Sequence, residues 1–182
     1  MTLVLGFVPF ILFSLVARVS DDLALWIAFA ASFALGMRAF LETRVLKTLD
    51  AAGTLLFGSL ALYKGFVQPG LASGAVQLVV HAGLLAVMVV SLFLHEPFTL
   101  QYSREQVLPE TWKTKSFLRA NNRLTAIWVL ALAVMAAIDA AALLTPDVSY
   151  TLAATAALVA LAGALTFTVR YPVTARESGG PD

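Results

Sequence analysis

Long blocks of apolar residues fill most of this chain, and the charged residues fall between the blocks. About twenty helical residues, rising 1.5 Å each, span the roughly 30 Å hydrocarbon core of a bilayer. A helix exposed to water needs a polar face, and these blocks have none. Only 13% of the residues are charged, against about 25% in soluble domains. The pattern predicts an all-α, polytopic integral membrane bundle.

The blocks predict six transmembrane helices in one domain, residues 1–172. The helices are predicted over about 3–17, 23–40, 51–66, 71–94, 124–144 and 150–169, and a flexible cytoplasmic tail over 173–182. Turn signals such as Gln68-Pro69-Gly70 separate them. No basic segment precedes the first block, so we interpret it as a retained helix rather than a signal peptide. This block is the shortest, which leaves open whether it spans fully.

The basic residues predict the orientation, because Lys and Arg near helix ends remain in the cytoplasm. With a cytoplasmic N-terminus, the outer segments hold only Arg18 and Lys64. The inner segments then hold Arg38, Arg44, Lys47, Arg104, Lys113, Lys115, Arg119, Arg123, Arg170 and Arg176. The asymmetry predicts that both ends of the chain lie in the cytoplasm.

Small side chains recur every fourth residue in two of the predicted helices. The second helix carries Ala28, Ser32 and Gly36, and the sixth carries Ala156, Ala160, Ala164 and Thr168. Such stripes let helix backbones approach closely in lipid. We expect them to serve packing inside the bundle; a homo-oligomer contact is the alternative.

The connection between the fourth and fifth helices, residues 98–123, mixes basic and aromatic side chains. We interpret it as a short amphipathic helix on the cytoplasmic leaflet, with Pro109 in its first turn and Asn121-Asn122 loosening its end. Its cations would face anionic headgroups. The candidate contacts are Arg104, Trp112, Lys113, Lys115, Phe117, Arg119 and Arg123. A docking site for a cytosolic partner is the alternative.

Two ionisable residues lie inside predicted membrane helices, where such residues are costly and often functional. Asp139 stands among alanines in the fifth helix, and His81 stands in the fourth with Gln77 one turn away. Lys64, near the end of the third helix, completes the candidate intramembrane polar site. These residues could form a proton or cation path. Alternatively, Asp139 pairs with His81 or with Lys64 only to fix helix packing.

The charges at the cytoplasmic boundary, Arg38, Arg44 and Asp50, are interpreted as ordinary interface residues. Other patterns point away from chemistry. The chain has no cysteine, which excludes disulfides and thiol catalysis, and its two histidines are too few for a histidine metal centre. No glycine-rich phosphate loop is present, and a net charge of +1 gives no sign of nucleic-acid binding. We therefore predict no enzymatic activity, no cofactor and no metal.

Several short features resemble one family over roughly residues 5–172. They are Phe7-Val8-Pro9, the basic residues from Arg38 to Lys47, Phe57-Gly58, Pro97, Leu108-Pro109 with Trp112, and Asn122 ahead of Trp128. The layout resembles the intracellular septation protein A family, the inner membrane-spanning proteins also called YciB. The chain departs from the family between Trp112 and Asn122, which is longer here, and Asp139 stands where that family typically has a polar amide.

The resemblance implies a multi-pass protein of the bacterial inner membrane that supports envelope maintenance or septation without catalysis. Its implied partners are membrane lipids and envelope-synthesis or division proteins. Two alternatives remain from the residues themselves. One is a small proton-coupled transporter or channel that uses Asp139 and His81, and the other is lipid binding or handling.

Overall fold

The computed structural model describes residues 2–145 and 150–170, and this part of the chain is helical without strands. The elements are α1 (Thr2–Gly6), α2 (Val8–Val16), α3 (Asp21–Thr43), α4 (Thr48–Leu62), the π-helical turn η1 (Tyr63–Val67), α5 (Ser73–Phe93), α6 (Thr99–Arg104), the 3-10 helix η2 (Pro109–Lys113), α7 (Lys115–Leu144) and α8 (Tyr150–Arg170). The predicted all-α class is confirmed. The predicted tail, 173–182, lies outside the described residues.

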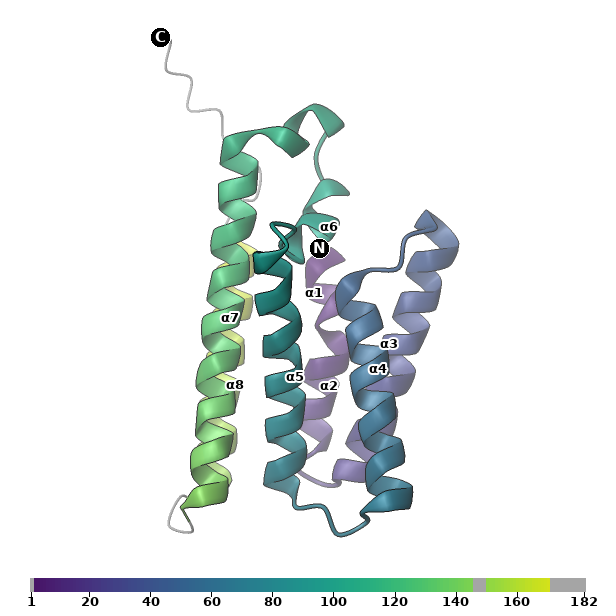
Figure 1. Ribbon diagram of the computed structural model, residues 1–182, viewed down its shortest axis with the longest axis vertical. Coiled ribbons are helices and arrows are strands. Elements are labelled where there is room, and N and C mark those ends of the chain that lie inside the picture. The colour runs from purple at the N-terminus through teal and green to yellow at the C-terminus, as the bar shows by residue number, and fades with distance from the viewer. Residues whose placement is uncertain (1, 146–149, 171–182) are drawn as a thin grey trace.

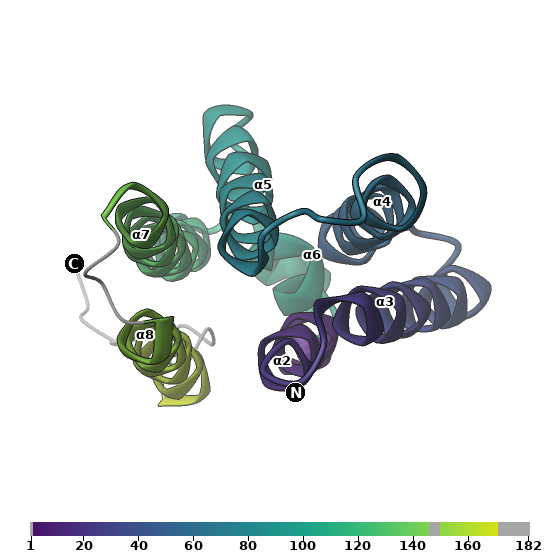
Figure 2. The same ribbon diagram turned by 90° about the horizontal axis from the view of Figure 1, so that it is seen from below.

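The long helices stand side by side in two rows. Seen along the bundle, α7, α5 and α4 form one row, and α8, α2 and α3 form the other (Figure 2). From α2 on, successive long helices run in opposite directions, and α6 and η2 cap one end (Figure 1). We call this end, which holds α6, η2 and the start of α7, the basic end.

Among the described residues, three helices are long and apolar enough to cross a membrane: α3, α5 and α7, which contain 18-residue stretches with mean hydropathies of 1.7, 2.3 and 2.4. Large apolar side chains on their outer surfaces, such as Phe33, Val90 and Leu130, are exposed. A water-soluble bundle would carry polar residues there. These features are compatible with a membrane protein.

The small-residue stripe of α3 packs against α4. Ser32 is fully buried and faces Gly53, where an added Cβ would lie 2.6 Å from the Ser32 Oγ. One turn on, a Cβ at Gly36 would lie 3.2 Å from the Cβ of Asp50. The two helices therefore approach each other closely at these glycines, which leaves little room for a larger side chain.

The stripe of α8 also lies inside the bundle. Ala164 is buried, and Thr168 accepts a hydrogen bond of 3.0 Å from the indole Nε1 of Trp128 on α7. Both stripes thus contact neighbouring helices of the same chain, as the packing interpretation predicted.

Aromatic side chains fill the space between the two rows. The Phe7 ring stacks on Trp128 of α7 at a centroid distance of 3.6 Å. Phe10 and Phe13 contact Phe57 of α4, with centroids 4.9 and 5.4 Å apart. These contacts join the N-terminal segment to both α4 and α7.

The predicted first helix, 3–17, is wrong as one continuous element. The chain breaks between α1 and α2 at Phe7, and Pro9 lies in the first turn of α2. Proline lacks an N–H, so Pro9 cannot donate the backbone hydrogen bond to Leu5 that a continuous helix would need. The break turns the Phe7 ring towards Trp128.

The predicted start of the fifth helix at residue 124 is also wrong. Helix α7 begins at Lys115, and the Thr114 hydroxyl accepts a hydrogen bond from the N–H of Phe117 at this end. The buried face of α7 continues from Phe117 through Asn121 and Leu124 to Trp128 at helical spacing. The connection therefore contains α6, η2 and the first turns of α7, in place of one amphipathic helix, and Asn121-Asn122 does not interrupt the helix.

The remaining boundaries shift by a few residues. Helix α3 extends two to three residues beyond the predicted 23–40 at both ends, and α4 begins before the predicted residue 51 and passes into η1. Helices α5 and α8 nearly coincide with the predicted 71–94 and 150–169. Helix ends commonly differ by this much, because turn residues adopt either state.

The contact between α3 and α4 yields a stability prediction. Gly53→Ala should lower the free energy of unfolding by about 1–3 kcal/mol, because the methyl group overlaps Ser32 and Phe10. Thermal unfolding of the detergent-solubilised protein measures the change. Gly163→Ala on α8, where a Cβ meets no atom within 4 Å, is the matched control and should be neutral or stabilising. Equal behaviour of the two variants would contradict the close-packing interpretation.

Candidate functional site

The structure brings Asp139 and His81 together in the bundle interior. The His81 Nδ1 lies 2.6 Å from Oδ2 of Asp139, which joins α5 to α7. The two residues are only 5% and 2% exposed. A buried carboxylate is tolerated only with such a partner, so this bond fixes the two helices against each other.

Helical periodicity explains why the two side chains meet. Asp139 continues the buried face of α7 that Trp128, Leu132 and Met135 form at spacings of four and three. On α5 the buried face contains Val80, His81, Leu84 and Met88. The polar pair lies near the end of this apolar seam that is remote from the basic end.

Lys64 lies elsewhere. Its Nζ is 3.2 Å from Oδ1 of Asp22, in the first turn of α3, and Lys64 itself is buried. This ion pair joins η1 to α3. The candidate intramembrane site therefore divides into two separate pairs, one at α5 and α7 and one at η1 and α3.

Gln77 is buried one turn before His81 on α5. Both line a cavity of about 20 Å³, together with Ser14 and Arg18. A second cavity, of about 10 Å³, lies between His81 and Trp128. A water molecule needs at least about 10–15 Å³. Each space thus accommodates about one water molecule, and neither has room for a larger solute.

The basic and aromatic residues of the connection separate into two groups. Lys113, Lys115, Arg119 and Arg123 are exposed at the basic end. Arg104 and Trp112 are partly buried and contact each other, with the guanidinium 5.6 Å from the indole centroid. Phe117, predicted to anchor in lipid, is 0% exposed. That prediction is wrong for Phe117, because its side chain belongs to the buried face of α7.

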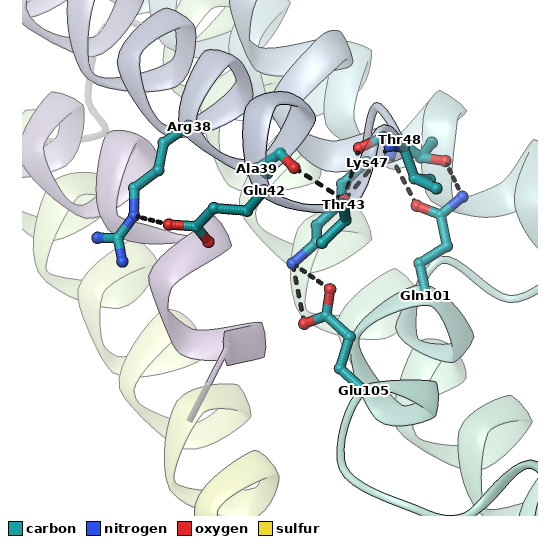
Figure 3. Close-up of polar contacts among 9 residues, drawn as sticks. Arg38, Ala39, Glu42, Thr43, Lys47, Thr48, Gln101 and Glu105 are labelled. Atoms are coloured by element: carbon teal, nitrogen blue, oxygen red, sulfur yellow. Dashed lines mark hydrogen bonds and ion pairs between the residues drawn. The ribbon is translucent and has the colours of Figure 1, made fainter.

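A polar network holds α4 to α6 at the basic end (Figure 3). The Lys47 Nζ lies 2.8 Å from Oε1 of Glu105 and 4.8 Å from the Tyr102 ring centroid. The side chain of Gln101 caps α4: its Oε1 accepts from the Thr48 N–H at 2.8 Å, and its Nε2 donates to the Thr48 hydroxyl at 2.9 Å. A side chain from α6 thus supplies the cap that Lys47, at the N-cap position, does not.

A cavity of about 280 Å³ adjoins this network. Arg38 and Glu42 of α3 line it, together with Tyr102 of α6 and Glu105 just after α6. Asp50 of α4 also lines it, and is only 4% exposed. Burial, together with the nearby carboxylates of Asp50 and Glu105, raises the pKa of Tyr102, so its hydroxyl remains protonated at neutral pH. We call this space the basic-end cavity.

Sequence reasoning missed this cavity. It treated Asp50 and Arg38 as ordinary boundary charges, used Lys47 only for the orientation and the family resemblance, and did not include Tyr102 or Glu105 in a candidate site. Lys47 and Glu105 are far apart in the sequence, so no spacing rule connects them. The sequence signal that could have indicated the cavity was the position of Asp50. It lies within one turn of Gly53, on a helix whose glycines indicate close packing against a neighbour.

Within residues 2–145 and 150–170, no group of three or more His, Asp or Glu side chains is placed to hold a metal ion. Comparison of the chain with known proteins found no matching family, no similar curated protein and no similar solved structure.

The His81–Asp139 pair generates a testable coupling. Asp139→Ala should destabilise the protein by about 3–5 kcal/mol, because it leaves buried His81 without its partner. The double variant Asp139→Ala with His81→Ala should lose less free energy of unfolding than the two single variants lose together. Thermal unfolding in detergent measures these losses. Glu96→Ala, at an exposed residue, is the control. Additive losses would show that the two side chains do not interact.

Proposed function

We propose that this chain is a non-enzymatic, multi-pass protein of the bacterial inner membrane that acts through contacts with other membrane proteins. The observation that carries the proposal is the use of its interior polar groups. His81–Asp139 joins α5 to α7, and Lys64–Asp22 joins η1 to α3. Trp128–Thr168 joins α7 to α8. Polar side chains in the bundle thus hold helices to one another, which favours a rigid scaffold over a site of turnover.

The same bundle supports the six-span topology. Alongside α3, α5 and α7, we propose that α1 with α2, α4 with η1, and α8 also cross the membrane. The exposed cations Lys113, Lys115, Arg119 and Arg123 belong to η2 and to the first turns of α7, at the basic end. Arg18 follows α2 and Lys64 follows α4, and both of these helices end on the side of the bundle remote from α6 (Figure 1). The positive-inside rule then places the basic end in the cytoplasm.

Cysteine labelling tests this topology directly, because the natural chain has no cysteine. Lys113→Cys, at the basic end, should react with a membrane-impermeant maleimide only after the cells are opened. Gly70→Cys, in the turn between η1 and α5, should react in intact spheroplasts. The reverse labelling would overturn the orientation, and labelling of both positions from one side would overturn the six-span count.

For the biological role, we propose envelope maintenance or septation, as the resemblance to the intracellular septation protein A family implies. The test is cell length and envelope sensitivity in a host strain that lacks the gene. Wild type and Asp139→Asn should both restore these phenotypes, because an amide can still hydrogen-bond His81 without carrying charge. A strain with unaltered division and envelope would contradict this role.

A second candidate function is a small proton-coupled transporter or channel. The observation that favours it is the short His81–Asp139 bond beside two spaces that each accommodate about one water molecule. Imidazole and carboxylate groups in contact with water can relay protons. In this case Asp139→Asn would fail in complementation while it inserts at normal levels. Proteoliposomes with wild type would then show proton flux into a pH-dye-loaded lumen, and Asp139→Asn would abolish it.

A further inference from the structure

The basic-end cavity contains an excess of acid that the protein itself does not neutralise. Its lining includes three carboxylates and two cations. Both cations already have partners: Arg38 lies 2.8 Å from Glu42, and Lys47 lies 2.8 Å from Glu105. Asp50 is the lining carboxylate without an ion pair among the described residues.

Asp50 is also the most deeply buried of the three acids. It is 4% exposed, and its Oδ1 is buried with no hydrogen-bond partner. A buried oxygen of this kind normally has a partner, because an unmade hydrogen bond there costs the full desolvation of the group. The backbone of α3 runs close to this side chain, because a Cβ added at Gly36 would lie 3.2 Å from the Cβ of Asp50. The position therefore favours a donor, and preferably a cation, supplied from outside the chain.

The surroundings of Asp50 favour an ammonium group over a metal ion. Mg²⁺ and Ca²⁺ require six or more oxygen ligands in close geometry. No metal-holding group of three acidic or histidine side chains occurs in the described chain. A primary ammonium carries one positive charge and three N–H donors. The Asp50 carboxylate lines the cavity and offers such a group an acceptor and a counter-ion.

The size and lining of the cavity set the size of the ligand. About 280 Å³ lies just below the range of roughly 300–1,000 Å³ found for pockets of drug-sized ligands. Leu5 and Leu35 add apolar surface, and the side chains of Arg38 and Glu42 at its rim are exposed. The space suits a short amino-alkyl group that enters from the surface at the end of the bundle.

We propose that the basic-end cavity binds a primary ammonium group, carried by an aminophospholipid headgroup or by a small free amine, with Asp50 as its principal counter-ion. This binding is independent of whether the bundle acts as a scaffold or as a proton path. It assigns a ligand to a part of the chain remote from the His81–Asp139 pair.

The test uses the purified full-length protein in detergent, with thermal stability as the readout. The probes are ethanolamine and short-chain phosphatidylethanolamine, and the matched probes are choline and short-chain phosphatidylcholine. We expect a saturable rise in Tm with a primary-ammonium probe. The trimethylated probes should bind at least about tenfold more weakly, because they are bulkier and have no N–H donor.

Variants locate the binding. Asp50→Asn should weaken binding about tenfold or more, because it removes the counter-ion but keeps the side-chain shape. Glu105→Gln should also weaken it, because Lys47 loses its partner and becomes free to neutralise Asp50. Glu110→Gln removes an equal charge at an exposed residue outside the cavity lining and should bind as wild type does. Glu105→Gln keeps the test decisive if Asp50→Asn does not fold.

The outcomes separate the sources of the amine. Protection by the lipid alone assigns a headgroup site, and equal protection by ethanolamine at the same concentration assigns a site for a free amine. The proposal is overturned if neither primary-ammonium probe protects the wild type. It is also overturned if the trimethylated probes protect equally well. The same holds if Asp50→Asn and Glu105→Gln, or whichever of the two folds, bind the probes with wild-type affinity.

Discussion

Apolar surroundings give a polar side chain no water to bond with, and the arrangement of this bundle follows from that constraint. The His81–Asp139 bond is the clearest case, because each group would be costly to bury alone. The hydrogen bond brings the buried faces of α5 and α7 together. On α7 this face also contains the apolar residues Trp128, Leu132 and Met135. The same rule acts near the ends, where Lys64 contacts Asp22 and Gln101 caps α4. Asp50 is one of several described residues with a buried polar atom that has no hydrogen-bond partner, and it is the one for which we propose a ligand.

The two candidate functions make different demands on the same pair. A scaffold needs the hydrogen bond but not the charge, whereas a proton relay needs a group that can gain and lose a proton. The cavities beside His81 are small, so the pair lies in a tightly packed helix interface with room for only one or two water molecules. The basic-end cavity differs from it in both size and charge, and its exposed rim makes it accessible from the surface. The molecule therefore separates a closed polar contact in its interior from an open polar cavity at its end.

Much of the fold could be predicted from the sequence, since block length and apolar content indicate helices regardless of tertiary context. Stripes at spacing four also indicated the close contact at Ser32, because small side chains have few other uses in lipid. The sequence did not locate the start of α7, because the cations around Phe117 resemble a surface segment although one face is buried. It did point to Asp139 and His81 as candidates, since ionisable groups in apolar blocks are rare, but not to which residue pairs with which. The basic-end cavity depends on contacts between Lys47 and Glu105, which no local pattern encodes.

Helix α7 runs without interruption for 30 residues, or about 45 Å, which exceeds the roughly 30 Å of hydrocarbon. Its exposed first turn, with Lys115 and Arg119, and its buried Asp139 thus belong to one stiff rod. A partner or a charged surface that pulls on the first turn would tilt the whole rod, and the load would reach the His81 contact without any intervening hinge. The surface of the basic end and the buried polar contact are thus carried by one unbroken helix.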